Sequence, residues 1–263
     1  GITGVEFPAS LKTIGREAFM GCTGIESLHI PGTVTSIDAN AFRGCTGLKT
    51  LVMDDLADAE GTTYGNGIFY GCTSLNSVRL PQNMPAYNNM FRECSSLPEL
   101  VLPDSLKSIY SPVGGFEIIG MNSLEKLVFP STVEKLSSES GAVLCTYGQM
   151  VSYVSVPGAR EIAEIVPTNI RILALPATLE SFSVTGSNIE VVLFGGTEEQ
   201  WNAAVTDSAK SVLEKNGTKV FFNADGAGAG ASATITKQPE SKSIFQGIGD
   251  PTLSVEAQAP EGA

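Results

Sequence analysis

Apolar residues recur along most of the chain at six, three and one positions before a marker residue that is usually proline. The positions at minus three and minus one alternate with outward positions in a period of two, which predicts a short β-strand with one buried face. A proline at the marker ends such a strand, because it has no amide hydrogen to donate to a neighbour. The markers follow one another at intervals of 19 to 27 residues and are Pro8, Pro31, Asp54, Pro81, Pro103, Pro130, Pro157, Pro176 and Gly195.

Each repeat has an apolar stripe that it cannot bury by itself, whereas stacked repeats form one continuous core. We therefore predict a solenoid of about nine coils with a parallel sheet. A partial tenth copy is formed by Val220 and Phe222. The nine apolar triplets are Ile2/Val5/Phe7, Ile25/Leu28/Ile30, Leu48/Leu51/Met53, Leu75/Val78/Leu80, Leu97/Leu100/Leu102, Leu124/Leu127/Phe129, Val151/Val154/Val156, Ile170/Leu173/Leu175 and Ile189/Val192/Phe194.

A second apolar pair follows many markers, at plus three and plus six, and predicts a short extended segment on the return side of the coil. These pairs are Leu11/Ile14, Val34/Ile37, Met84/Tyr87, Leu106/Ile109, Val133/Leu136 and Leu179/Phe182.

The phrase that recurs most closely is AFMGCTGIESLHIPGTVTSI, residues 18–37, and this pattern resembles the BspA-like class of leucine-rich repeats. The resemblance is close over residues 9–103 and weaker over residues 104–195. It implies an α/β-type solenoid dominated by β-structure, a right-handed coil with a parallel sheet. It also implies a secreted or cell-surface bacterial interaction module.

The repeat pattern ends near FGGTEEQWNAAV, residues 194–205. Thr197 and Gln200 have the spacing of a capping box, so a short helix is predicted to begin at Glu198. We expect Trp201 to lie on the inner face of this helix as a cap on the solenoid core rather than as a ligand platform. The stretch resembles the closing element of BspA-like arrays.

Three segments follow from these patterns: a solenoid with its C-terminal cap at 1–223, a Gly/Ala linker at 224–233, and a tail at 234–263. The tail resembles the first strands of a bacterial immunoglobulin-like domain, and is otherwise an extended tail. Because such a sandwich needs about 100 residues, we expect the segment to be part of a longer modular protein.

The charge balance narrows the possible partners. The chain has 28 acidic and 16 basic residues and a net charge of −12, which disfavours nucleic acid and anionic membranes. No apolar run is long enough for a transmembrane helix.

The only histidine, His29, occupies an outward position, so a catalytic triad is not expected, and we predict no enzyme activity, cofactor or metal site. The acidic insertion at 54–67 is expected to be a solvated loop rather than a calcium site.

Four cysteines, Cys22, Cys45, Cys72 and Cys94, occupy one position nine residues before successive markers. Metal ligands would need closer spacing, and stacked coils would bring the thiols near one another without fixing disulfide geometry. We predict a row of reduced, buried core residues. Cys145 lies off this row, at the position of a core phenylalanine, and is also expected to be reduced and buried.

Function is expected on the outward side of the strands. The outward positions at minus two and minus four become more apolar in the C-terminal half, and an exposed apolar patch usually marks an interaction site. The alternative is that these residues only favour strands or are covered by a neighbouring segment. The predicted binding surface consists of Val128, Tyr153, Ile172, Ala174, Val191, Leu193 and Phe221.

Two functions remain open. The first is an adhesin-like module that binds a protein or glycan, or associates with itself. The second is a passive spacer that presents neighbouring domains.

Overall fold

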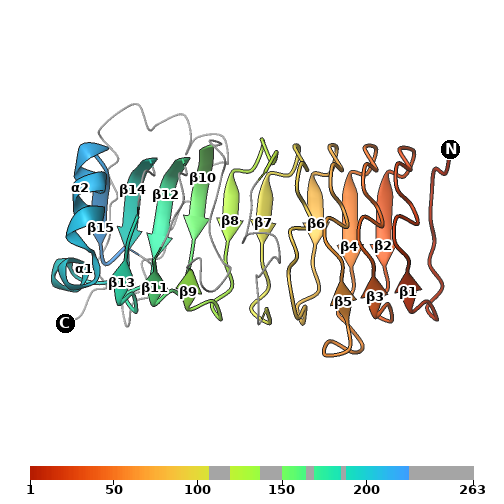
Figure 1. Cartoon of the computed structure of the whole chain (residues 1–263), viewed down its shortest axis with the longest axis horizontal. Coiled ribbons are helices and arrows are strands. Elements are labelled where there is room, and N and C mark those ends of the chain that lie inside the picture. Colours follow the sequence, from red (N-terminus) through yellow and green to blue (C-terminus); the bar gives the residue numbers. More distant parts are fainter. Residues whose placement is uncertain (107–118, 137–149, 164–168, 185–187, 225–263) are drawn as a thin grey trace, which may run out of the picture.

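The computed structural model describes residues 1–106, 119–136, 150–163, 169–184 and 188–224. These residues form a β-solenoid (Figure 1). Its strands run across the long axis of the molecule, and successive strands lie side by side and parallel to one another along that axis. Few helices are present, and both lie at the C-terminal end of the described chain. Cys145, Ile109 of the second apolar pairs, the predicted linker and the tail predicted to resemble an immunoglobulin-like domain fall outside the described residues, apart from Ala224.

The main face of the solenoid carries two parallel sheets rather than the single sheet that was predicted. The first contains β2 (Ser27–Ile30), β4 (Thr50–Met53) and β6 (Ser77–Arg79). The second runs β7, β8, β10, β12, β14 and β15, and these strands comprise Glu99–Val101, Lys126–Val128, Met150–Ser155, Asn169–Leu175, Asn188–Phe194 and Lys219–Phe222.

The register within both sheets places the equivalent positions of neighbouring repeats opposite each other. Leu28 pairs with Leu51 in the first sheet, and Leu127 pairs with Val154 in the second. All four are buried residues at minus three. The predicted period of two is therefore confirmed, and the partial tenth copy forms β15. The first triplet is an exception, because residues 1–8 form no strand.

The return side carries short two-residue strands in two further sheets, and four of the six end on the second residue of a predicted apolar pair, namely Ile14, Ile37, Leu136 and Phe182. The strands that end at Tyr64 and Ile162 fall where no pair was predicted, and the predicted pair Met84/Tyr87 lies in no named strand. One of these sheets contains β1 (Thr13–Ile14), β3 (Ser36–Ile37) and β5 (Thr63–Tyr64). The other contains β9 (Lys135–Leu136), β11 (Glu161–Ile162) and β13 (Ser181–Phe182). In five of these six strands the second residue is buried, which closes the core opposite the main sheets.

A column of phenylalanine rings runs through the N-terminal part of the core. The Phe19 and Phe42 ring centroids are 5.1 Å apart, Phe42 and Phe69 are 5.4 Å apart, and Phe69 and Phe91 are 5.6 Å apart. The planes of each pair differ by 13° or less, so the rings stack from coil to coil. This column holds the coils together independently of the hydrogen bonds in the main sheets.

Helix α1 (Glu198–Ala204) begins where the sequence predicted. The Thr197 hydroxyl accepts from the Gln200 amide, and the Gln200 side chain accepts from the Thr197 amide. A second helix, α2 (Asp207–Lys215), was not predicted. Its signals are an N-cap at Thr206 and the spacing of Ala209 and Leu213, both of which are buried.

Candidate functional site

The predicted surface residues lie in two adjacent rows on the outside of the six-stranded sheet. The first row pairs Ala174 with Leu193 and Leu193 with Phe221, and Val128 begins it two strands earlier. The second row pairs Tyr153 with Ile172 and Ile172 with Val191. The structure thus brings the seven residues together on one sheet; we call them the outer apolar face.

Exposure varies within the outer apolar face. Phe221 is 51% exposed, and Val128, Tyr153, Ile172, Val191 and Leu193 are half-buried. Ala174 was expected to be exposed but is only 8% exposed, although it does not belong to the hydrophobic core cluster. Its cross-strand neighbours are Ser155 and Leu193. Ala174 therefore contributes little contact area.

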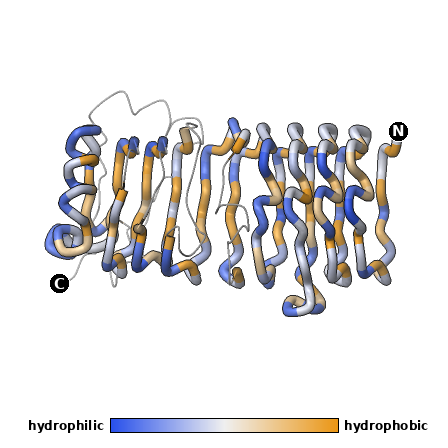
Figure 2. Tube along the Cα trace, in the orientation of Figure 1, coloured by the Kyte–Doolittle hydropathy of each residue, from blue (hydrophilic) through white to orange (hydrophobic). Residues whose placement is uncertain are grey.

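The three-stranded sheet presents a different outer surface. Its equivalent rows contain Ser27, Thr50 and Ser77 at minus four. His29 and Arg79 flank Val52 at minus two. Figure 2 shows that hydrophobic colouring extends along much of β10, β12 and β14. The minus-two row is apolar from Val101 on β7 to Val128 on β8, whereas the minus-four row still carries Glu99 and Lys126 there and becomes apolar only at Tyr153 on β10.

The boundary between the two sheets has a local cause at Pro98. Five positions before the marker, the Lys49 amide donates to Glu26 at 2.8 Å and the Asn76 amide to Lys49 at 3.0 Å. The Glu125 amide likewise donates to the Pro98 carbonyl at 2.8 Å. Pro98 has no amide hydrogen, so it cannot donate to Asn76. Among the described residues no backbone hydrogen bond joins β6 to β7, and the sheet divides there.

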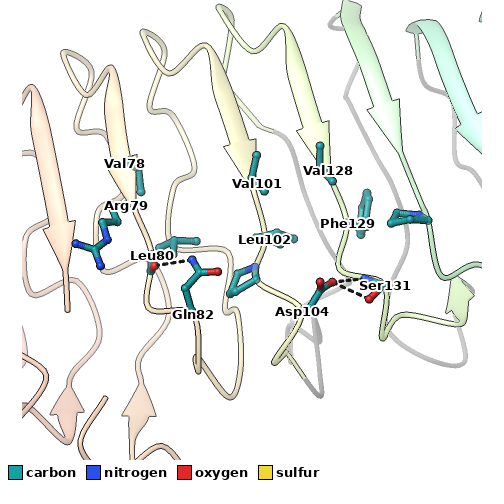
Figure 3. A pocket seen from close by; sticks show the side chains of 12 residues that line it. Val78, Arg79, Leu80, Gln82, Val101, Leu102, Asp104, Val128, Phe129 and Ser131 are labelled. Carbon is teal, nitrogen blue, oxygen red and sulfur yellow. Dashed lines mark hydrogen bonds between the residues drawn. The ribbon is translucent and has the colours of Figure 1, made fainter. Parts of the chain in front are cut away.

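Two adjoining pockets open along this division. The larger has a volume of about 510 Å³ and the smaller about 270 Å³, and both are lined by Val78, Leu80 and Val101. Together they form what we call the β6–β7 groove. Figure 3 shows its walls, with Val78 and Leu80 on one side and Val101 and Leu102 on the other. Val128 and Phe129 lie on the next coil, beyond Val101 and Leu102. Val101 is 47% exposed, so an apolar edge is open to solvent.

Two charged side chains that line the larger pocket, Asp104 and Arg79, differ in whether they have a hydrogen-bond partner. Asp104 accepts from the backbone amide of Ser131 at 2.6 Å and from its hydroxyl at 2.8 Å. Arg79 has no hydrogen bond or acidic partner within the described ranges. Two other basic side chains on the outer rows have acidic partners, Lys126 with Glu99 at 2.8 Å and His29 with Asp54 at 2.9 Å.

The cysteine row lies in the core beside the phenylalanine column. Each thiol donates to the carbonyl of the phenylalanine one coil before it: Cys45 to Phe19 at 3.2 Å, Cys72 to Phe42 at 3.3 Å, and Cys94 to Phe69 at 3.3 Å. All four cysteines are free, and Cys45, Cys72 and Cys94 are buried. Cys22 was expected to be buried but is half-buried, because no earlier cysteine stacks over it.

Two of the buried thiols, Cys72 and Cys94, have raised pKa values, whereas the hydrogen bond with Cys72 lowers the pKa of Cys45. The pKa of Cys94 is raised to about 12 because burial penalises the thiolate. The pKa of Cys72 is also raised, first by its hydrogen bond with Cys45 and then by burial. Such thiols are poor nucleophiles at neutral pH, since the thiolate is the reactive form.

The remaining candidate residues show packing or surface contacts. Trp201 is 5% exposed, and its ring lies 5.7 Å from Phe182 and 5.3 Å from Phe194. In the acidic insertion, the Asp58 side chain accepts from the Gly61 amide at 2.9 Å, which closes a turn. Within the described part of the chain, no group of three or more His, Cys, Asp or Glu side chains is arranged to hold a metal ion.

The sequence of the N-terminal part of the chain matches the model of one protein family. Residues 1–113 match the BspA type leucine rich repeat region in six copies. The match covers the phenylalanine column and the cysteine row. Leucine-rich repeats of this kind generally act in protein interactions and not as enzymes. No curated protein is similar enough in sequence to match the chain.

Solved structures of leucine-rich repeat proteins also resemble the chain. A leucine-rich repeat protein of T. pallidum is 20% identical, with a TM-score of 0.41, over 81% of this chain and 80% of that one. One from Bacteroides ovatus is 19% identical, with a TM-score of 0.39, over 80% of this chain and 64% of that one. A leucine rich cell surface protein from Faecalibacterium prausnitzii is 18% identical, with a TM-score of 0.29, over 75% of this chain and 86% of that one.

In the described ranges, neither helix is long and apolar enough to cross a membrane.

Proposed function

We propose that this chain is a non-enzymatic protein-interaction module that binds its partner through the outer apolar face. The observation that carries this proposal is the change in surface chemistry between the two main sheets. Both sheets have buried inner faces, yet only the second presents branched and aromatic side chains on adjacent strands. A contiguous exposed apolar surface usually serves binding.

The composition of the outer apolar face favours a protein partner over a glycan. Tyr153 and Phe221 supply aromatic contact area, and Val191 and Leu193 supply aliphatic area between them. Lys126 and Lys219 stand at the two ends of the second row and provide a charged rim. An apolar centre with a polar rim is the usual anatomy of a protein interface.

The number of coils, the C-terminal cap and the cellular location are further parts of this proposal. We propose about nine right-handed coils, whose C-terminal end is closed by α1 and α2 with Trp201 against Phe182 and Phe194. We also propose a secreted or cell-surface location, which the BspA-type repeats of residues 1–113 favour. An adhesin-like role and self-association are more specific forms of the proposal, and a glycan partner is a competing outcome of the test below.

The test is a matched pair of substitutions at the same repeat position. Leu193→Glu charges the outer apolar face, and His29→Glu places the same charge at the minus-two position of β2 in the three-stranded sheet. The purified chain is first screened against immobilised extracellular-matrix proteins and against a glycan array. We expect at least a tenfold loss of binding for Leu193→Glu and little change for His29→Glu, with circular dichroism confirming that both variants are folded.

The alternative function is a passive spacer that presents neighbouring domains, and the same experiment distinguishes the two functions. A spacer would bind nothing in either screen, and sedimentation velocity would show a monomer unaffected by Leu193→Glu. Binding that both variants retain would remove the outer apolar face from the proposal.

A further inference from the structure

The β6–β7 groove has the shape and the backbone chemistry of a site for an extended peptide. It runs along the strands, because the smaller pocket is lined by Asn76 and Pro98 near the strand starts and the larger by Gln82 and Asp104 beyond the strand ends. The backbone edges of β6 and β7 that face it carry no hydrogen bond to each other. Extended peptides bind such edges through main-chain hydrogen bonds and place side chains in adjacent pockets.

The groove is a surface feature and does not divide the core. Beneath it the Phe69 and Phe91 rings remain stacked at 5.6 Å, and the Cys94 thiol reaches the Phe69 carbonyl at 3.3 Å. In Figure 1 the interval between β6 and β7 is wider than that between other neighbouring strands of the main sheets. The coils are thus held together on the core side while their strand edges stand apart, so a ligand can enter without unfolding the solenoid.

The side chains of the groove select the kind of peptide. Val78 and Val101 line the opening from opposite strands. Val78 occupies an inward position and is half-buried, whereas its equivalents Leu51 and Leu100 are buried, and Val101 occupies an outward position. An apolar side chain inserted here would remove both valines from water. Arg79 lines the larger pocket and is unpaired within the described residues, while Asp104 accepts from Ser131 and Glu99 pairs with Lys126. The Arg79 guanidinium lies on the β4 side of β6 in Figure 3, so it reaches a ligand in the groove by turning towards the opening. The groove therefore complements a carboxylate next to an apolar side chain.

We propose that the β6–β7 groove binds an extended acidic segment of a protein partner. An apolar side chain of the segment lies between Val78 and Val101, its backbone bonds to the open strand edges, and a neighbouring carboxylate pairs with Arg79. The proposal rests on the proposed function and deepens it, because Val128 belongs both to the outer apolar face and to the wall of the groove. It names the class of partner and the point where that partner is anchored.

Two matched peptides test the proposal on the whole chain. Acetyl-Val-Glu-Val-amide carries one carboxylate, and acetyl-Val-Gln-Val-amide has the same shape without the charge. Each is titrated to its solubility limit into isotope-labelled protein, and amide chemical shifts are followed by NMR. We expect saturable shifts at Val78, Arg79 and Val101. The Glu peptide should bind about two- to fivefold more tightly than the Gln peptide, the range for one exposed ion pair.

Three variants connect these shifts to the groove. Val101→Trp fills the opening and should abolish them, and Arg79→Gln should make the two peptides bind equally. Lys215→Gln removes an exposed charge on α2, outside both proposed surfaces, and should change neither result. Shifts that are absent from the groove, equal for both peptides in the unmodified chain, or unaffected by Arg79→Gln would overturn the proposal, as would a glycan that titrates these residues when neither peptide does.

The outcome separates this proposal from the proposed function. If Leu193→Glu abolishes partner binding and the peptides do not bind the groove, the outer apolar face stands and the groove proposal fails. If the peptides bind the groove but no partner depends on Leu193, the groove stands as a site and the outer apolar face is wrong.

Discussion

Pro98 lies across the β6–β7 groove from Asn76, and no hydrogen bond joins their backbones. At the same repeat position, Asn76 donates to Lys49 and Glu125 donates to Pro98. A residue without an amide hydrogen thus stands at the point where the three-stranded sheet ends and the six-stranded sheet begins. The groove exists because the core below the strands continues across this interruption.

Replacing Pro98 should close the sheet. Pro98→Asn restores an amide that can donate to Asn76, and we expect the amide of Glu99 to become protected in hydrogen exchange. The gain of about 1 kcal/mol from the new hydrogen bond is largely offset by the greater freedom of the unfolded chain, about 0.4–1 kcal/mol. Exchange rates are therefore the measurement, since the free energy of unfolding should change little.

The reciprocal substitution is the control for Pro98. Asn76→Pro removes the hydrogen bond to Lys49 and should open a second division between β4 and β6, at a cost of about 1–3 kcal/mol. If the Glu99 amide exchanges equally fast in the unmodified chain and in Pro98→Asn, the missing amide is not what divides the sheet.

The phenylalanine column should be most sensitive in its interior. Phe69 is fully buried between two stacked rings, so Phe69→Ala should lower the free energy of unfolding by about 3–5 kcal/mol. Phe19→Ala at the half-buried end of the column should cost clearly less. Urea denaturation followed by circular dichroism measures both, and equal losses would show that the stacking does not depend on position.

The four described cysteines should differ in their accessibility to thiol reagents. Cys22 is half-buried and should be the first to be labelled by iodoacetamide in the native protein. Cys45, Cys72 and Cys94 should be labelled only as fast as the solenoid opens. Mass spectrometry of peptides at increasing labelling times gives the order. Rapid labelling of Cys72 would contradict the buried row.

The Cys94 thiol should make the fold sensitive to alkaline pH. Its folded pKa of about 12 lies above the unfolded value of about 8.5, so between these values the folded state binds more protons than the unfolded state. The stability from this group is complete below about pH 8.5 and is lost as the pH rises towards 12, at up to about 1.4 kcal/mol per pH unit.

Cys94→Ala provides the comparison for this pH dependence. The free energy of unfolding of both proteins at pH 7 gives the packing cost of the substitution, and the same measurement at pH 10 gives the pH-dependent part. The variant should lose less stability than the unmodified chain between the two pH values. An equal loss would assign the alkaline sensitivity to other groups.

Glu93 occupies a backbone position that favours glycine. Its φ is 58°, and the equivalent residues Gly44 and Gly71 have φ of 71°. Glu93→Gly should therefore raise the free energy of unfolding by about 1 kcal/mol, although it removes an exposed hydrogen bond from Tyr70. Gly44→Ala should lower stability by a similar amount, and thermal denaturation of the two variants checks both directions.

Sequence patterns predicted the strands well because the repeat states the same physical requirement many times. The triplet positions recur in every coil, and the pairing of Leu28 with Leu51 follows once equivalent residues are aligned. The positions of the outer apolar face follow by the same reasoning, and whether they bind a partner stays a prediction. Helix α1 was predictable from its capping box, whereas α2 follows so closely on α1 that its own N-cap signal at Thr206 was overlooked.

Periodicity alone determined which side chains point inward, because a strand alternates its faces and each coil must bury the same stripe. The tertiary structure decided how far neighbouring coils remain joined. Ala174 is buried beside Leu193 although its position faces outward, and Cys22 is half-buried at the end of its row. Pro98 is visible in the sequence, but the groove that it creates depends on a core that stays packed while the strand edges above it lose their hydrogen bonds.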